Sequence, residues 1–225
     1  MIPDTHEDPL ALSVSSLSYS YGVGSETTLT FPEVQIARGQ SCAVVGPSGC
    51  GKTTLLHLVA GLLTPQAGSI HVAGQRMDTR SQRDRDRLRG RLIGIVLQQL
   101  RLVASLSALD NLLLAQRLSG QPVDRAAATE QLVGLGLGQH LHRRPGALSQ
   151  GEAQRVAIAR ALMGQPALLL ADEPSSSLDD ANAERVLRLL TEQAAEHGAA
   201  LLVVTHDARI RGRLDQEIEL TGAAA

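Results

Sequence analysis

The stretch Gly46-Pro-Ser-Gly-Cys-Gly-Lys-Thr-Thr54 decides the fold of this 225-residue chain. It has the pattern G-x-x-x-x-G-K-T. It lies between an apolar run, Ser41–Val45, and the segment Thr53–Leu63, whose leucines and valine recur at helical spacing. Glycines at a strand-to-helix turn let successive backbone N–H groups point inward, and the helix N-terminus adds a dipole that favours anions. The pattern in this context predicts a loop that binds the phosphates of a nucleoside triphosphate.

Each residue of this loop is therefore a candidate nucleotide ligand. Lys52 is expected to reach the β- and γ-phosphates, and the hydroxyl of Thr53 is expected to bind Mg²⁺. The expected ATP-binding residues of the loop are Gly46, Pro47, Ser48, Gly49, Cys50, Gly51, Lys52, Thr53 and Thr54. A chance glycine-rich turn is the alternative, and the strand and helix on either side argue against it.

Composition and charge limit the kind of protein that this chain can be. Its length and its 43% hydrophobic content suffice for one large domain with a proper core. The net charge of −2 does not favour a nucleic-acid binder. Residues 1–9 lack the apolar segment of a signal peptide, and no apolar run approaches the ~20 residues that cross a bilayer. We expect a cytosolic protein in which Cys42 and Cys50 are reduced thiols, because a disulfide between them would strain the loop.

Apolar runs and helical patterns alternate along the chain. The expected strands are Leu12–Tyr19, Thr28–Ile36, Ser41–Val45, Ser69–Val72, Leu92–Leu97, Ala167–Ala171 and Ala200–Thr205. The expected helices are Thr53–Leu63, Leu109–Leu118, Asp124–Leu135, Ser149–Met163 and Asp180–His197. This alternation predicts an α/β fold with a largely parallel sheet and helices on its faces.

Local signals refine this prediction. Ser149 and Glu152 have the spacing of a capping box, and Asp124 is placed to cap the helix that follows it. The segment from Arg76 to Arg91 interleaves arginines with aspartates. Alternating charges of this kind favour a solvated helix with local ion pairs, and a nucleic-acid patch is the alternative.

Polar side chains follow several of the expected strands directly. Because ligands bind at the carboxyl ends of parallel strands, we expect Gly46, Gln98, Asp172, Glu173 and His206 to converge on one edge of the sheet. Asp172 is suited to hold Mg²⁺, directly or through water, and Glu173 to accept a proton from the attacking water. Gln98 is suited to orient water or complete the metal shell, and His206 to donate to the γ-phosphate.

The segment Leu148-Ser-Gln-Gly-Glu-Ala-Gln-Arg-Val-Ala-Ile-Ala-Arg160 resembles the signature helix of the ATP-binding cassette (ABC) ATPases. With the phosphate loop, Leu170-Ala-Asp-Glu-Pro174 and Ser177-Leu-Asp179, the resemblance is specific and extends over nearly the whole chain.

The resemblance implies a single domain over residues 10–221 after a tail of residues 1–9. Residues 10–98 and 165–221 would form a P-loop NTPase (RecA-like) core with an antiparallel β edge. Residues 99–164 would form an inserted α-helical subdomain.

The resemblance also implies a role for each matching residue. Gln98 would be the Q-loop residue, Asp172 the Walker B aspartate, Glu173 the catalytic glutamate, Asp179 a D-loop residue and His206 the switch histidine. Tyr21 would stack on adenine, although the residue by itself reads as an ordinary surface tyrosine. The catalytic set would be Glu173, His206, Gln98 and Lys52, and the metal set Thr53, Gln98 and Asp172.

The signature would act on the nucleotide of a second copy of the chain. Its residues are Leu148, Ser149, Gln150, Gly151 and Glu152. Gln150 stands where the family has the first signature glycine, a change that would weaken or retune closure of a dimer. Ser175 stands where many relatives have threonine.

Family members work as dimers that enclose two ATP molecules, so the resemblance implies ATP, Mg²⁺, a homodimer and an integral membrane permease that docks near Gln98. No nucleic-acid partner is expected. We therefore expect an ATPase subunit of a membrane transporter, peripheral on the cytoplasmic face of the inner membrane and similar to the lipoprotein-release and macrolide-exporter type. The alternatives are a regulatory ABC ATPase without transport, a soluble ABC ATPase of DNA repair or translation, and a small-molecule kinase.

Overall fold

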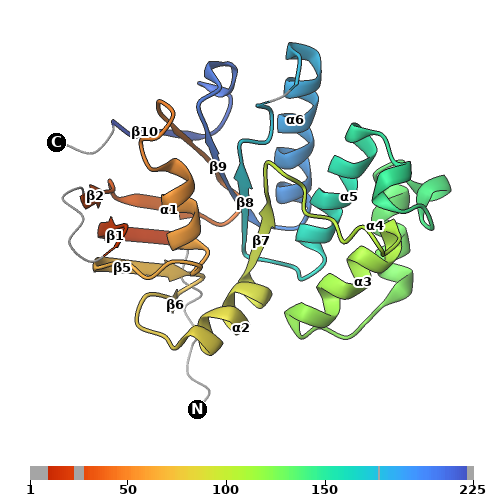
Figure 1. Ribbon diagram of the computed structural model, residues 1–225, viewed down its shortest axis with the longest axis horizontal. Coiled ribbons are helices and arrows are strands. Elements are labelled where there is room, and N and C mark those ends of the chain that lie inside the picture. Colours follow the sequence, from red (N-terminus) through yellow and green to blue (C-terminus); the bar gives the residue numbers. More distant parts are fainter. Residues whose placement is uncertain (1–9, 23–27, 177, 222–225) are drawn as a thin grey trace.

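The computed structural model describes residues 10–22, 28–176 and 178–221, which form two sheets with helices around and between them (Figure 1). The strands are β1 (Leu10–Ser20), β2 (Thr28–Thr30), β3 (Val34–Ala37), β4 (Ser41–Val45), β5 (Ala67–Val72), β6 (Gln75–Arg76), β7 (Ile93–Val96), β8 (Leu168–Asp172), β9 (Ala200–Thr205) and β10 (Gln216–Glu219). The α-helices are α1 (Lys52–Val59), α2 (Gln82–Leu92), α3 (Ala108–Ser119), α4 (Arg125–Gly134), α5 (Gln150–Leu162) and α6 (Asp180–Glu196). Three short 3₁₀ helices are η1 (Gly138–His140), η2 (Pro145–Ala147) and η3 (Ala208–Ile210).

The first sheet is parallel, with the strand order β10-β4-β9-β8-β7. Strands β8 and β9 are buried along their whole length, because both faces of the sheet are covered. Leu168 and Leu170 belong to the same apolar cluster as the leucines of α1. Leu169 and Ala171 point to the other face, where they belong to a cluster with α5 and α6. The α/β class and the P-loop NTPase architecture predicted from the sequence are confirmed.

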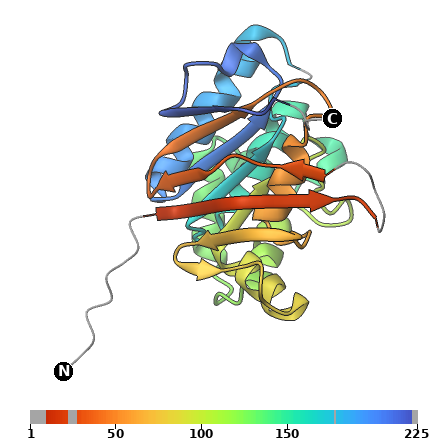
Figure 2. The ribbon, with the colours of Figure 1, turned by 90° about the vertical axis from the view of Figure 1, so that its left-hand side faces the viewer.

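The second sheet is antiparallel and covers the far side of α1. Its order is β2-β1-β5-β6, and β3 also pairs with β1. Figure 2 shows β1 and β5 side by side at the front of this sheet. Apolar residues of β1 and β5 share a core cluster with α1, so α1 is enclosed between the two sheets. Both ends of α1 are fixed by this packing, which positions the phosphate loop that precedes it.

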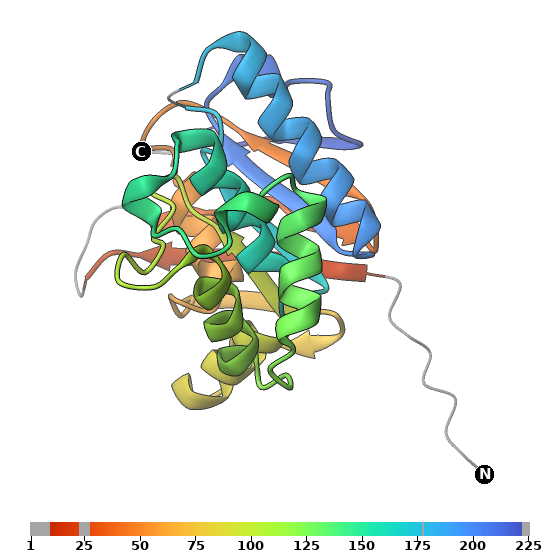
Figure 3. The ribbon, with the colours of Figure 1, turned by 90° about the vertical axis from the view of Figure 1, so that its right-hand side faces the viewer.

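Helices α3, α4 and α5 enclose a third apolar cluster, beside the parallel sheet (Figure 3). The predicted caps are present here. Asp124 accepts hydrogen bonds from two backbone amides at the start of α4, and Ser149 and Glu152 form the reciprocal bonds of a capping box at the start of α5. Caps of this kind contribute about 1 kcal/mol each to helix stability. The capping bonds of Ser149 and Glu152 thus fix the backbone of the signature segment at the start of α5.

Several predicted elements differ in extent from those observed. The predicted strand Thr28–Ile36 is two strands, β2 and β3, because Pro32 stands between them without a backbone N–H for a ladder bond. The predicted helix Thr53–Leu63 ends at Val59, since the chain turns at Gly61 with φ at 67°. Strand β10 was not predicted.

The local predictions for the arginine-rich segment and for the two cysteines are confirmed. The arginine-rich segment contains α2, which has no buried residue and carries an ion pair of 2.7 Å between Arg89 and Asp86. Cys42 and Cys50 are free thiols, and burial raises the pKa of Cys42 to about 12. Within the described ranges, no helix has the length and apolar character that a membrane span requires. Predictions for residues 1–9 and Ser177 fall outside those ranges.

Candidate active site

A cleft of about 490 Å³ lies at the carboxyl edge of the parallel sheet, above the start of α1. It is lined by residues from the phosphate loop, the β1–β2 edge and the ends of β7, β8 and β9. These residues are Tyr21, Leu29, Ser48, Gly49, Gly51, Lys52, Thr53, Thr54, Gln98, Glu173 and His206. The structure therefore brings together side chains that lie more than 180 positions apart in sequence.

The phosphate loop has a backbone that its glycines require. Gly49 and Gly51 have φ values of 82° and 102°, in the left-handed region that favours glycine. A Cβ on Gly46 would lie 2.5 Å from the carbonyl oxygen of Leu220, so the loop is also closely packed against the end of β10. The substitution of any of these glycines would distort the loop.

Lys52 is 6% exposed, and its ammonium group donates to loop carbonyls. Its Nζ lies 2.9 Å from the carbonyl oxygens of both Gly46 and Pro47. The nearest carboxylate oxygen is that of Glu173, at 4.0 Å. A buried ammonium needs acceptors of this kind, and negatively charged oxygens in the cleft are stronger acceptors than carbonyls.

Asp172, at the end of β8, faces Thr53 at the start of α1. The Thr53 hydroxyl donates to Asp172 Oδ1 over 3.3 Å. Burial raises the pKa of the Asp172 carboxyl, and the hydrogen bond from Thr53 opposes that rise. Gln98 is nearby in the cleft, where its amide donates to the hydroxyl of Ser176 over 3.0 Å.

These oxygen donors fit Mg²⁺, which uses one or two protein ligands and completes its shell with water and phosphate oxygens. No group of three or more His, Cys, Asp or Glu side chains in the described part of the chain is arranged to hold a metal ion. A site built on the carboxylate of Asp172 and the hydroxyl of Thr53 does not need such a group. The set therefore fits a metal that arrives with a phosphate ligand.

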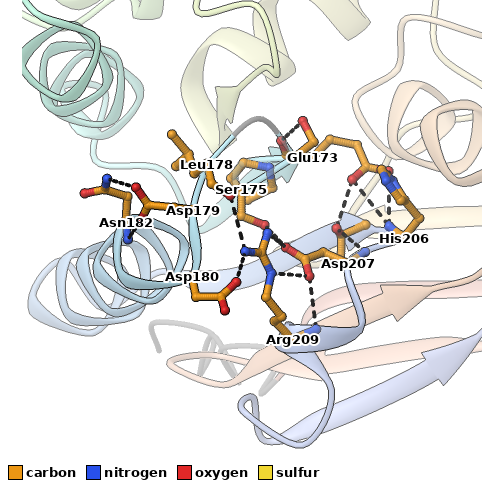
Figure 4. Close-up of polar contacts among 12 residues, drawn as sticks. Glu173, Ser175, Leu178, Asp179, Asp180, Asn182, His206, Asp207 and Arg209 are labelled. Atoms are coloured by element: carbon orange, nitrogen blue, oxygen red, sulfur yellow. Dashed lines mark hydrogen bonds and ion pairs between the residues drawn. The ribbon is translucent and has the colours of Figure 1, made fainter.

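Glu173 has a strained backbone and a firmly held side chain. Its φ is 47°, which is unfavourable for a residue with a Cβ and is typical of functional positions. The carboxylate accepts a hydrogen bond of 2.9 Å from the Thr205 hydroxyl and a weaker one from the backbone N–H of His206. The Nδ1 atom of His206 lies 2.8 Å from Glu173 Oε1, and Figure 4 shows the two side chains pointing toward each other.

Tyr21 stands at the rim of the cleft. Its side chain is 59% exposed, and its hydroxyl is 2.7 Å from the hydroxyl of Thr54 at the start of α1. Its ring packs edge-on against Tyr19, with 4.9 Å between the ring centroids. Tyr21 is thus held beside the phosphate loop with much of its ring exposed, and its stacking on adenine stays a prediction.

The signature residues lie outside the cleft, and Ser149, Gln150 and Gly151 among them are exposed. Gln150 and Gly151 instead line a separate groove together with Leu178 and Asn182, at the starts of α5 and α6. Glu152, which caps α5, is also held by the imidazole of His140, at 3.2 Å. In the described residues, the signature therefore belongs to a different surface from the phosphate loop of the same chain.

A polar network beside the cleft was not predicted from the sequence. The hydroxyl of Ser175 is buried and donates to Asp207 Oδ2 over 2.7 Å. Arg209 binds both oxygens of the same carboxylate (Figure 4). These hydrogen bonds, with that from Arg209 the largest cause, lower the pKa of Asp207 to about 2. The positions of Ser175, Asp207 and Arg209 in the sequence do not indicate that their side chains are in contact.

The sequence profile of one family, described as "ABC transporter", matches residues 30–176. The chain belongs to this family. The lipoprotein-releasing system ATP-binding protein LolD of Xanthomonas campestris pv. campestris (strain 8004) is 41% identical over 208 residues, which are 91% of this chain and 87% of that protein. A LolD protein of Xylella fastidiosa (strain Temecula1) is 40% identical over 213 residues, or 93% of this chain and 89% of its own. Membership of this family excludes the alternative prediction of a small-molecule kinase.

Solved structures show the same relationship. The dimeric post-hydrolysis structure of the ATP-binding cassette MJ0796, bound to ADP and Pi, aligns with a TM-score of 0.81 and 30% identity, covering 93% of this chain and 94% of that chain. The structure of cbiO1 from Clostridium perfringens, part of the ABC transporter complex cbiONQ, aligns with a TM-score of 0.85 and 28% identity, covering 97% and 88%. The chain therefore shares its fold with ABC cassettes over almost its whole length.

Proposed function

We propose that the chain binds and hydrolyses ATP as the nucleotide-binding subunit of a lipoprotein-releasing transporter. The observation that carries this proposal is the cleft itself, in which Lys52, the Thr53–Asp172 pair and Glu173 meet at the carboxyl edge of the parallel sheet. The LolD relatives, about 40% identical over more than 90% of the chain, support the kind of transporter. This arrangement supports ATP hydrolysis as the reaction of the site.

Nucleotide binding rests on the phosphate loop. The left-handed glycines turn backbone N–H groups toward the cleft, and the start of α1 adds its dipole. Lys52 exchanges the carbonyls of Gly46 and Pro47 for the β- and γ-phosphate oxygens. Tyr21 then offers its exposed ring to the adenine.

The chemical step is attack of water on the γ-phosphate. Mg²⁺, held by Thr53, Asp172 and Gln98, would neutralise charge on the phosphate oxygens. Glu173 accepts a proton from the attacking water, while the bonds from Thr205 and His206 keep its carboxylate in place.

His206 can serve both Glu173 and the γ-phosphate only when its ring carries two protons. A neutral imidazole has one N–H, so Nδ1 cannot donate to Glu173 while Nε2 also donates to phosphate. A neutral ring would therefore donate to only one of these two partners.

The complete site is formed by two copies of the chain. The signature residues do not line their own cleft, and Ser149, Gln150 and Gly151 are exposed. A related cassette has been solved as a dimer bound to ADP and Pi. We infer that Ser149 and the amides at the start of α5 complete the phosphate site of the partner copy. ATP would thereby close the dimer, and hydrolysis would reopen it.

The permease partner would dock in a groove between the core and the helical layer. This groove, of about 560 Å³, is lined by residues of β7, the segment after it, α3 and the end of α5, among them Ile95, Val103, Leu114 and Leu118. Leu118 is 73% exposed, so the groove has an apolar rim. Docking there would place the chain peripherally on the cytoplasmic face of the inner membrane.

Glu173→Gln tests the proposal directly. We expect turnover to fall by at least about 100-fold, because the amide cannot accept the proton, while ATP still binds and stabilises a dimer. Phosphate release and size-exclusion chromatography with ATP measure the two effects. Glu184→Gln, at a surface position that pairs with Arg213, is the matched control and should behave as wild type.

Two results would contradict the proposal. Normal phosphate release by Glu173→Gln would show that Glu173 is not the base. A strictly monomeric Glu173→Gln variant at saturating ATP would show that the site is not shared between copies. Co-purification of the wild-type chain from membranes tests the permease partner, and a preparation that retains no integral membrane protein would argue against it.

A further inference from the structure

Arg209 connects three segments around the cleft. It lies in η3, just after His206, and it donates to both oxygens of Asp207, over 2.8 and 2.7 Å. Its Nη1 also donates to the carbonyl oxygen of Leu178, over 3.2 Å, and to the carboxylate of Asp180, over 2.6 Å. Figure 4 shows the guanidinium between these groups. One side chain therefore joins the segment after β9 to the segment before α6 and to the start of that helix.

The contacts differ in strength. Asp207 is 8% exposed and is bound on both oxygens by the planar guanidinium, a geometry that lysine cannot reproduce. Asp180 is 93% exposed, so water screens its pair with Arg209 and that pair contributes little. The carbonyl of Leu178 is the remaining acceptor. The link thus runs from Asp207 through Arg209 to the backbone at Leu178.

Both ends of this link lie at functional surfaces. Asp207 is anchored by the buried hydroxyl of Ser175 and directly follows His206, whose ring contacts Glu173. Leu178, at the other end, lines the same groove as the signature residues Gln150 and Gly151. The link therefore joins the hydrolytic side of the cleft to the surface that we assign to the dimer.

We propose that Arg209 is a positioning residue that fixes the segment Leu178–Asp180 against the His206–Asp207 turn, so that the dimer surface and the hydrolytic carboxylate keep one relative geometry. This inference rests on the proposed ATPase function and goes beyond it, because Arg209 contacts neither the cleft nor the signature in the described residues.

The test compares three variants of the full chain. Arg209→Gln removes the charge and the fork, and Arg209→Lys keeps the charge but offers only one nitrogen. Arg211→Gln is the matched control, since Arg211 also pairs with two carboxylates, Glu217 and Glu219, but at the edge strand β10. Each variant is assayed for kcat, for the dissociation constant of a fluorescent ATP analogue, and for hydrogen exchange at residues 178–182.

We expect Arg209→Gln to lower kcat about tenfold, because a small displacement of catalytic groups has effects of this size or larger. ATP affinity should stay within about twofold, since the phosphate loop is untouched. Amide exchange at residues 178–182 should become faster, and Arg209→Lys should be intermediate in both kcat and exchange. Arg211→Gln should match wild type throughout.

Other outcomes overturn the inference. A kcat for Arg209→Gln within about twofold of wild type, or an equal loss in Arg211→Gln, would show that Arg209 positions nothing. A parallel loss of ATP affinity would indicate general damage to the fold, and if Arg209→Gln does not fold, the same criteria apply to Arg209→Lys. Absence of hydrolysis in the wild type would overturn the proposed function alone, because the exchange measurement still tests the link.

Discussion

The carboxylate of Asp207, whose side chain is 8% exposed, makes the fold sensitive to acid. Arg209 and Ser175 lower its pKa to about 2, below its ordinary value near 4. Since the folded-state pKa is the lower one, the stabilisation is fully present above the ordinary value and is lost as the pH falls through about 2. The lowered pKa contributes about 2 kcal/mol to the free energy of unfolding at neutral pH.

We therefore expect Asp207→Asn to lower the free energy of unfolding by about 2 kcal/mol at pH 7 and by progressively less between pH 5 and pH 2. Urea unfolding at a series of pH values measures the difference. The control is Asp86→Asn, at an exposed position paired with Arg89 on α2, which should change little at any pH. A deficit for Asp207→Asn that stays constant with pH would contradict the assigned cause.

At the scale of residues, the sequence predicted those side chains whose position follows from the chain itself. Asp172 and Glu173 lie at the end of a buried strand, and Lys52 follows a glycine-rich turn. The place of Glu173 and Lys52 in the cleft, and of Asp172 against Thr53, could therefore be predicted from local pattern. The contact of Ser175 with Asp207 could not, because it joins positions 32 residues apart through the packing of β8 beside β9. The strained φ of Glu173 likewise has no signal in sequence.

At the scale of elements, β7 and α5 approach so closely that one position has to be glycine. A Cβ on Gly94 would lie 2.3 Å from the carbonyl oxygen of Ala161, which is backbone and cannot rotate away. We expect Gly94→Ala to force the strand and helix apart and to lower the free energy of unfolding by about 1–3 kcal/mol.

Gly134→Ala is the matched control for this prediction. Gly134 ends α4, is exposed, and would place its Cβ in open space. Alanine there should be neutral or stabilising by up to about 1 kcal/mol, because it favours the helix. Thermal and urea unfolding compare the two variants, and equal stability of Gly94→Ala and wild type would show that the close packing does not constrain the fold.

Elements with a strong apolar period were predictable, and edge elements were not. Strands β8 and β9 are continuous apolar runs because they lie at the centre of a parallel sheet. Strand β10, with the sequence Gln216-Glu-Ile-Glu219, lies at the edge and pairs only with β4, so it carries polar residues and reads as a loop. A strand is therefore easiest to predict from sequence when both of its faces are buried.

At the scale of the whole molecule, Arg160 ties the signature helix to the segment that follows Gln98. Its guanidinium donates to the carbonyl oxygens of Leu100 and Arg101, in the segment after Gln98. The helical layer, the segment that carries Gln98 and the cleft are thus connected by direct hydrogen bonds. A movement of the signature helix would therefore be transmitted to the segment that follows Gln98.

We propose that the side chain of Gln150, at the exposed start of α5, weakens closure of the dimer. In the Glu173→Gln background, we expect Gln150→Gly to lower the ATP concentration needed for dimerisation about threefold, because removal of the side chain lets the backbone amides approach the partner's phosphate. This factor corresponds to less than 1 kcal/mol. Analytical ultracentrifugation across an ATP titration measures it.

The same substitution should lower the stability of the monomer. Its effect on folding can therefore be told apart from its effect on dimerisation. Glycine in the first turn of α5 costs the helix up to about 1 kcal/mol, so the melting temperature should fall slightly while the dimer tightens. Gln121→Gly, in the exposed turn after α3, is the control and should leave the titration unchanged. An unaltered ATP dependence for Gln150→Gly would mean that the side chain does not stand between the two copies, whereas a weaker dimer would mean that it binds across them.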